Sequence, residues 1–392
     1  MHNRNVMDAP LLTVGSEVCV QFTDLEQLIE ALRRKGFQII GPTLQDSAIS
    51  YGPVNKLTDL PVGWTVQQGP GSYRLERRVD EAAFGYVPGP RSLKNFLHPS
   101  EFRVFTAEKQ NGAFRILPST EPAPKQAFLG VRPCELAAMR IQDRVLIDDR
   151  FTDQVYLGRR KNSFVVAVQC SDPAETCFCT SMDSGPRADW NYDLAMTEVV
   201  EGRRHEFLVE IGSQAGVDIL SQVPFSEASD ELREKCAEVT EKAGNRIERR
   251  LDAKTVRELL QKNFDSPEWE QVAGRCLACG NCTMVCPTCF CVNIEDTSDI
   301  TGNHAERWRK WDSCFTLGFS YIHGGCIRLS TSSRYRQWLT HKLSYWVDQF
   351  GVLGCVGCGR CIAWCPVGID ITREVQAIRA ASKPPRMQGE ET

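Results

Sequence analysis

The spacing of apolar and polar positions predicts a mixed α+β chain that begins with an α/β domain. Residues 11–40 contain two apolar runs around an amphipathic segment in which Leu25, Leu28 and Leu32 recur on one side. They therefore indicate a strand, a helix and a strand. Residues 48–105 consist of short β-like pieces broken by Gly and Pro, a pattern typical of β-rich insertions with many turns.

A strand–helix–strand unit follows these insertions. The runs 128–131 and 164–168 are apolar, and the segment 135–147 between them is helical in pattern. Strands joined by such a crossover are parallel and are commonly neighbours. Their carboxyl ends then meet at one edge of the sheet, which is where open α/β sheets bind ligands. The residues directly after both strands are therefore candidates for a site.

Two cysteine runs carry the most specific chemistry in the chain. Each has the C-x2-C-x2-C-x3-C-P spacing of a bacterial-type iron–sulfur site. In two-cluster ferredoxins the fourth cysteine of each run ligates the other cluster. The expected ligands are Cys276, Cys279, Cys282 and Cys365 for one [4Fe–4S] cluster, and Cys355, Cys358, Cys361 and Cys286 for a second. Structural zinc is the alternative, but a third evenly spaced cysteine and a Cys-Pro step, present twice, exceed the four ligands that zinc needs.

The second half of the chain has mainly helical periodicity. Residues 226–264 are charged and amphipathic, and aromatic and aliphatic residues between 335 and 350 recur at the same period. We therefore expect an N-terminal α/β domain with a βαβ unit and β-rich insertions, followed by an all-helical, ferredoxin-like dicluster domain. The predicted divisions are 1–222 for the α/β domain, 223–265 for a helical linker, 266–382 for the dicluster domain and 383–392 for a disordered tail.

A third group of cysteines follows the βαβ strands. Cys134 and Cys170 come just past the two predicted strand ends, and Cys177 and Cys179 lie in the adjoining loop. Cys134 also begins a helix, where free N–H groups favour a thiolate or an anionic cluster. We expect these four cysteines to hold a third iron–sulfur cluster. Their spacing is not a standard ferredoxin run, and a zinc site or four reduced thiols are the alternatives.

Composition and charge argue against a nucleic-acid-binding or membrane-spanning protein. The 392 residues carry a net charge of −4, which gives no electrostatic reason to bind nucleic acid. No apolar run approaches the ~18 residues of a membrane span, and the polar start does not resemble a secretory signal. Most of the 18 cysteines lie from Cys276 onward at ligand spacing, which favours a reducing, cytoplasmic location. Outside the three groups, Cys289, Cys291, Cys314 and Cys326 are interpreted as spare thiols, with an additional site as the alternative.

Three motifs together resemble a known family. Gly-Val-Arg-Pro-Cys-Glu at 130–135, Cys-Phe-Cys at 177–179 and Cys-Pro-Thr-Cys-Phe-Cys at 286–291 are similar to the β subunit of cytoplasmic NAD(P)-linked [NiFe] hydrogenases, also called sulfhydrogenases. The resemblance covers about residues 71–370. The A subunit of anaerobic sulfite reductase is similar too and is the alternative family.

The resemblance implies an electron-transfer subunit in reversible H2 oxidation coupled to NAD(P)+ reduction. Its partners would be a flavoprotein diaphorase subunit with FAD, and small and large [NiFe] hydrogenase subunits. The chain itself has neither the paired Cys-x-x-Cys of a nickel site at its two ends nor a G-x-G-x-x-G fingerprint after a strand. We therefore expect no catalytic residue. Two other hypotheses are a subunit that binds flavin or a sulfur substrate near Cys134 and Cys170, and a zinc-stapled scaffold.

Overall fold

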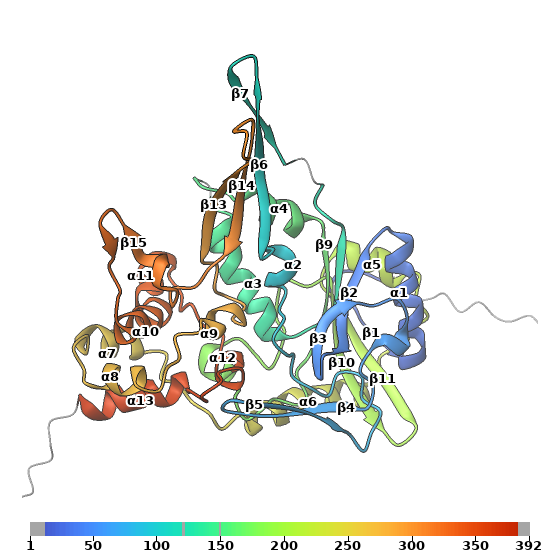
Figure 1. Ribbon diagram of the computed structural model, residues 1–392. Helices are drawn as coiled ribbons and strands as arrows, with labels where there is room; N and C mark the ends of the chain where they lie inside the picture. The colour runs from blue at the N-terminus through green and yellow to red at the C-terminus, as the bar shows by residue number, and fades with distance from the viewer. Residues whose placement is uncertain (1–11, 120–121, 149, 383–392) are drawn as a thin grey trace, which may run out of the picture.

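A central eight-stranded sheet organises the protein, in the order β12-β1-β11-β10-β9-β8-β2-β3 (Figure 1). The computed structural model describes residues 12–119, 122–148 and 150–382, so the predicted tail 383–392 lies outside the described residues. The pairs β2–β8, β8–β9 and β9–β10 are parallel, and the other pairs are antiparallel. The strands are β1 (Glu17–Gln21), β2 (Gln38–Gln45), β3 (Ala48–Pro53), β8 (Gln126–Val131), β9 (Ser163–Val168), β10 (Leu194–Glu201), β11 (Arg204–Ile211) and β12 (Ser226–Glu227).

Helices cover both faces of this sheet and build most of the C-terminal part. They are α1 (Leu25–Arg34), α2 (Lys94–Leu97), α3 (Pro133–Leu146), α4 (Gln154–Lys161), α5 (Gln214–Leu220), α6 (Asp230–Arg246), α7 (Val256–Lys262), α8 (Glu268–Ala273), α9 (Asn281–Met284), α10 (Thr331–Thr340), α11 (Trp346–Phe350), α12 (Arg360–Ala363) and α13 (Ile371–Ala381). Shorter turns are the 3-10 helices η1 (Phe22–Asp24), η2 (Leu57–Asp59), η3 (Cys179–Met182) and η4 (Leu317–Ser320), and the π-helical η5 (His341–Tyr345).

The predicted βαβ unit is confirmed. β8 and β9 pair in parallel and are joined through α3 and α4. Alternate residues of β8 face opposite layers: Leu129 packs in the core beneath α1 and α5, whereas Phe128 packs in the core beneath α3 and α4. Because both faces are covered, the whole of β8 is buried, which explains its apolar sequence from Ala127 onward.

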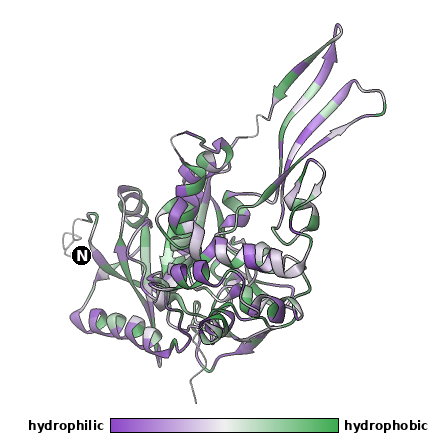
Figure 2. Ribbon diagram, turned by 90° about the vertical axis from the view of Figure 1, so that its left-hand side faces the viewer, coloured by the Kyte–Doolittle hydropathy of each residue, from purple (hydrophilic) through white to green (hydrophobic). Residues whose placement is uncertain are grey.

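The prediction of an all-helical second half is wrong for residues 292–311. β13 (Val292–Ser298) and β14 (His304–Trp311) form a hairpin, and β14 pairs with β6 (Glu101–Gln110) from the first half of the chain. The resulting sheet, β13-β14-β6-β7, includes β7 (Ala113–Pro118) and projects from the body as an arm (Figures 1 and 2). The helical periodicity on which the prediction relied lies at residues 335–350, beyond this hairpin. A strand such as β14, whose hydrogen-bond partner β6 is distant in sequence, shows little local pattern of its own.

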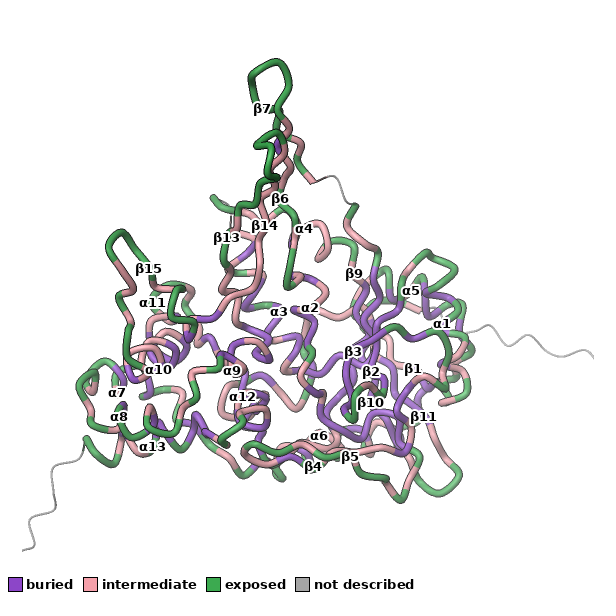
Figure 3. The backbone as a smooth tube through the Cα atoms, viewed as in Figure 1, coloured by how far each residue is buried: buried purple, intermediate pink, exposed green. Residues whose placement is uncertain are grey.

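The prediction is also wrong for the short hairpin at 321–326, whereas the segments 331–350 and 371–381 are helical as predicted. α10, η5 and α11 cover the segment in which aromatic residues recurred, and Tyr335, Trp338 and Leu343 are buried in its core. Two further small hairpins are β4–β5 (Trp64–Gly69 and Ser72–Arg77) and β15–β16 (Tyr321–Ile322 and Gly325–Cys326). Burial is concentrated in the body and is low along the arm (Figure 3). Within the described ranges, no helix is long and apolar enough to cross a membrane.

Candidate iron–sulfur centres

The two ferredoxin-type runs fold in the same way. Each passes through a loop to a glycine in the left-handed conformation, Gly280 with φ +74° and Gly359 with φ +73°, and that glycine caps a short helix. The helices are α9 and α12, which pack against each other. The third cysteine of each run therefore lies on a helix, with the first two in the loop before it and the fourth just after it.

The first run and the last cysteine of the second run surround one cavity. This cavity is lined by Cys276, Cys279, Cys282 and Cys365, and also by Cys361. Tyr335 and Trp338 lie on its wall. The grouping is the one that crossed pairing of the two runs requires.

Cys286, the fourth cysteine of the first run, lies with the second run instead. Burial raises the pKa of the Cys355 thiol to about 12, and Cys286 and Cys358 add to this increase. Burial also raises the pKa of Cys361, again with contributions from Cys355, Cys358 and Cys286. The contacts agree: Thr288 Oγ1 lies 3.1 Å from Cys286 Sγ and donates to the carbonyl of Gly354 at 2.8 Å, which brings Cys286 beside the start of the second run.

A buried lysine that the sequence analysis missed faces this second group. Lys342 is 3% exposed, and its Nζ donates to Cys286 Sγ at 3.3 Å, Thr288 Oγ1 at 3.0 Å and the Gly354 carbonyl at 2.7 Å. A hydrogen bond from Cys289 and the charge of Lys342 lower the pKa of Cys286 well below its usual value. Cys286 is thereby prepared as a thiolate, the form in which cysteine binds metal.

The third group of predicted cysteines also converges. Cys134, Cys170, Cys177 and Cys179 line one cavity, together with Cys358 of the second run. Cys134 lies in the first turn of α3 after β8, and Cys170 follows β9, so the parallel pair brings them to one sheet edge. The loop that carries Cys177 and Cys179 is held by a 2.8 Å hydrogen bond from Phe178 N to Gly357 O.

Two buried arginines give this third cavity a positive lining. Arg132 is 1% exposed and donates to the carbonyls of Gln169 and Tyr86 at 2.9 and 2.8 Å, while Arg360 is 2% exposed and pairs with Glu135. Arg132 Nε and Arg360 Nη2 have no hydrogen-bond partner within the described residues.

Buried hydrogen-bond donors without a partner at the first and third cavities indicate whether an anionic cluster fits there. A buried donor without a partner costs about 1–3 kcal/mol. The hydroxyl of Tyr335 and the indole N–H of Trp338, at the first cavity, are likewise unpaired in the described part of the chain. Both cavities therefore present N–H or O–H groups that the sulfur atoms of an anionic cluster would satisfy.

The arrangement of the cysteines also argues against the alternative of a structural zinc ion. A zinc ion holds four thiolate sulfurs about 3.8 Å apart, given Zn–S bonds of about 2.3 Å in a tetrahedron. Within 12–119, 122–148 and 150–382, no three His, Cys, Asp or Glu side chains are grouped as the ligands of a single metal ion. The cysteines of the first and third groups instead line cavities, an arrangement that suits a multi-atom cluster.

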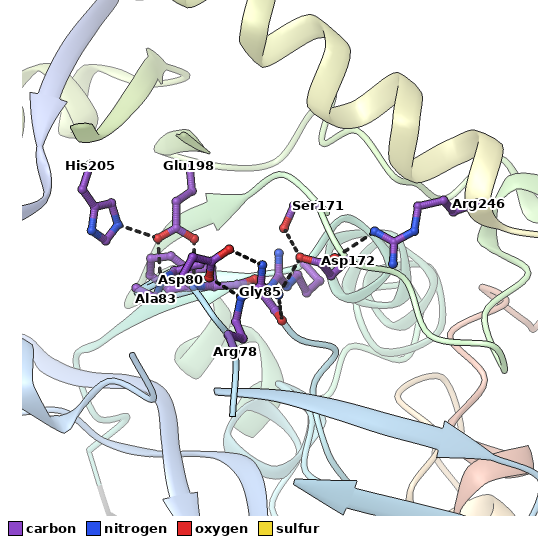
Figure 4. A network of polar contacts seen from close by, with 12 residues as sticks. Arg78, Asp80, Ala83, Gly85, Ser171, Asp172, Glu198, His205 and Arg246 are labelled. Atoms are coloured by element: carbon purple, nitrogen blue, oxygen red, sulfur yellow. Dashed lines mark hydrogen bonds and ion pairs between the residues drawn. The ribbon is translucent and has the colours of Figure 1, made fainter. Parts of the chain in front are cut away.

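A polar network around Asp172 anchors the loop after β9 (Figure 4), and Asp172 follows Cys170 closely in the sequence. Asp172 accepts hydrogen bonds from Arg78 at 3.0 Å and Arg246 at 2.8 Å. Nearby, Glu198 accepts from the backbone N–H groups of Ala83 and Phe84, which fixes the segment that follows Arg78. The network connects segments that are distant in sequence and that surround the third cavity. No local sequence motif predicts it.

Comparison with known proteins agrees with this geometry. The 4Fe–4S dicluster domain family matches residues 275–369, a range that spans both ferredoxin-type runs. Among curated proteins, Sulfhydrogenase 2 subunit beta of Pyrococcus furiosus is 30% identical over 313 residues, which cover 79% of this chain and 89% of that protein. No solved structure matches. The chain belongs to the family of sulfhydrogenase β subunits and is an iron–sulfur protein with a 4Fe–4S dicluster domain.

Proposed function

We propose that this chain relays electrons between a [NiFe] hydrogenase module and a flavoprotein NAD(P) module in reversible H2 oxidation. The observation that supports a relay is the adjacency of the three cysteine groups. Cys361 of the second run also lines the first cavity, and Cys358 of the same run also lines the third. Electron transfer weakens steeply with distance, so neighbouring sites in a row suit a relay, with the second cluster in the middle.

The proposed cofactors are three [4Fe–4S] clusters on this chain. Their ligands are the sets named above: Cys276, Cys279, Cys282 and Cys365; Cys355, Cys358, Cys361 and Cys286; Cys134, Cys170, Cys177 and Cys179. Each cluster would supply one-electron chemistry. FAD and the nickel–iron centre belong to the partners, a flavoprotein diaphorase subunit and the small and large hydrogenase subunits, in a cytoplasmic complex.

The residues of this chain would hold and tune the clusters rather than react. Arg132 and Arg360 carry positive charge at the third cavity, and Lys342 carries it beside Cys286. Positive charge and hydrogen bonds to sulfur favour the reduced, more negative state of a cluster and raise its potential. No acid, base or nucleophile is needed for this role.

The experiment that tests the relay uses the assembled complex with Cys279→Ser. Loss of one ligand of the first cluster should lower H2-dependent NAD(P)+ reduction at least tenfold. Reduction of a viologen dye, which takes electrons directly from the hydrogenase module, should stay unchanged. The matched control is Cys236→Ser, because Cys236 is buried on α6 away from the cavities.

Two results would contradict the proposal. Full NAD(P)+ reduction in Cys279→Ser would show that electrons bypass this cluster. A native complex that contains siroheme and no nickel would place the chain with sulfite reduction instead of hydrogen oxidation.

A further inference from the structure

Apolar side chains are exposed around the first cavity. All 18 cysteines lie within the described residues, and among them only Cys279 is exposed. Leu277, two positions before it, is 63% exposed, and Val367, just after the second run, is 42% exposed. These three residues all line the first cavity. The first proposed cluster would therefore lie directly beneath an apolar part of the molecular surface.

A second group of exposed apolar side chains lies on the hairpin β15–β16 and its flanks. Between 48% and 68% of each side chain is exposed at Leu317, Tyr321, Ile322, Ile327 and Leu329. The segment 316–330 has no Asp, Glu or Lys and contains a single arginine, Arg328. Exposed large apolar residues gathered with so little charge are typical of a surface that contacts another protein.

The hairpin is attached to the wall of the first cavity. Phe315, which precedes the hairpin, is 1% exposed and lines the cavity together with Tyr335 and Trp338 of the following helix α10. The three rings contact one another, with centroid distances of 6.1, 5.8 and 5.4 Å. The hairpin lies on the same side of the molecule as α8 and α13, opposite to α1 (Figure 1), and Leu277 follows α8 while Val367 precedes α13. Both groups of exposed side chains therefore adjoin one cavity.

The family of the chain indicates what covers such a surface. The chain belongs to a family of subunits, so it has partner subunits in a complex. The arm also exposes apolar side chains, such as Phe114 and Ile116, but among the described residues none from the arm lines the first cavity. Electrons pass between proteins where a redox centre comes close to the surface, because the transfer weakens steeply with distance. The exposed ligand Cys279 gives the first cluster this position.

We propose that Leu277, Val367 and the β15–β16 hairpin form the docking surface for a partner subunit that carries its own redox centre. This inference rests on the proposed relay and adds which end of it meets a partner. One electron passes from the partner's centre, which is oxidised, to the first cluster, which is reduced, or in the reverse direction; no bond forms or breaks. The contact face of the partner should be apolar, because the hairpin offers few charges for ion pairs.

The test uses the assembled complex with Ile322→Asp or Leu329→Asp. A carboxylate buried in an apolar contact loses its water, so each variant should weaken retention of one partner subunit at least about tenfold in size-exclusion chromatography. Iron per chain should stay unchanged, because neither residue lines the first or third cavity. Val79→Asp is the matched control, since Val79 is fully exposed in the first half of the chain, and it should keep the complex intact.

A complex that keeps every subunit in both hairpin variants would overturn the proposal. Equal loss of a subunit in Val79→Asp would overturn it as well, because the effect would then not depend on the hairpin. Retention of subunits is measured without hydrogen or NAD(P), so a failure of the proposed hydrogenase role is distinguished from a failure of the docking surface.

Amide hydrogen exchange provides a second test that needs no variant. Peptides from 316–330 should exchange at least about tenfold more slowly in the complex than in the chain alone, because a docked subunit excludes water from the hairpin and restrains its opening. Equal exchange of these peptides in the two states would overturn the docking surface.

Discussion

At the scale of single residues, the cavities depend on close contacts that permit only certain side chains. Gly357 shows this most clearly, because a Cβ built on it would lie 2.6 Å from the Phe178 carbonyl and 2.7 Å from Cys179 N. Its φ of +62° is also in the left-handed region. The absence of a side chain lets the second cysteine run touch the loop that carries Cys177 and Cys179.

Gly357→Ala should therefore destabilise the protein by about 2–4 kcal/mol, the sum of a left-handed alanine and an overpacked contact. It should also reduce iron at the third site, because the loop must move. Gly112→Ala is the matched control: φ is +83° there, but a Cβ meets nothing within 4 Å. Thermal unfolding and iron analysis of both variants check the prediction, and equal losses of stability would refute the steric explanation.

At the scale of secondary-structure elements, the arm joins the two halves of the chain. β14 is an inner strand, hydrogen-bonded to β13 on one side and to β6 on the other, whereas β7 is an edge strand. Cys314 follows shortly after β14, so the pairing of β14 with β6 also positions Cys314.

Amide hydrogen exchange should be slower in the inner strand β14 than in the edge strand β7. Central amides of β14 have ladder partners on both sides, so they should exchange at least tenfold more slowly than those of β7, which has a free edge. Exchange measured on the native chain by mass spectrometry of short peptides checks this. Equally fast exchange in β14 and β7 would mean that the hairpin does not pair with β6 in solution.

At the scale of the whole molecule, the cysteine groups lie where the two halves meet. The third cavity is built from the βαβ unit, the loop that carries Cys177 and Cys179, and the second ferredoxin-type run. Without iron, the buried thiols would lose their metal, and Arg132 Nε and Arg360 Nη2 would keep no hydrogen-bond partner among the described residues. Metal binding is thus expected to be part of the folding free energy.

Removal of iron by an anaerobic chelator should lower the melting temperature by several degrees, and more if all clusters leave together. Limited proteolysis should then cut first within 266–382. The core around β1 and β11, formed by apolar side chains such as Val20 and Phe207, should resist longer. An unchanged melting temperature after complete iron loss would contradict the expectation.

The sequence by itself determined the features that local spacing encodes. The C-x2-C-x2-C-x3-C-P runs predicted the dicluster domain that the family comparison shows. The crossover pattern placed Cys134 and Cys170 at one sheet edge, because parallel neighbours end on the same side. The helices around Tyr335 followed from their 3.6-residue period. That these cysteines ligate clusters stays a prediction.

Only the tertiary structure decided the rest. The pairing of β14 with β6, the approach of Lys342 to Cys286 and the hydrogen bond from Asp312 N to Cys291 O join residues far apart in the chain. Such contacts depend on which surfaces meet after the elements form, and neither periodicity nor motif spacing records that choice. In the sequence, Lys342 falls in an ordinary helical pattern and would be interpreted as a surface residue. Only the folded structure shows that it is buried against Cys286.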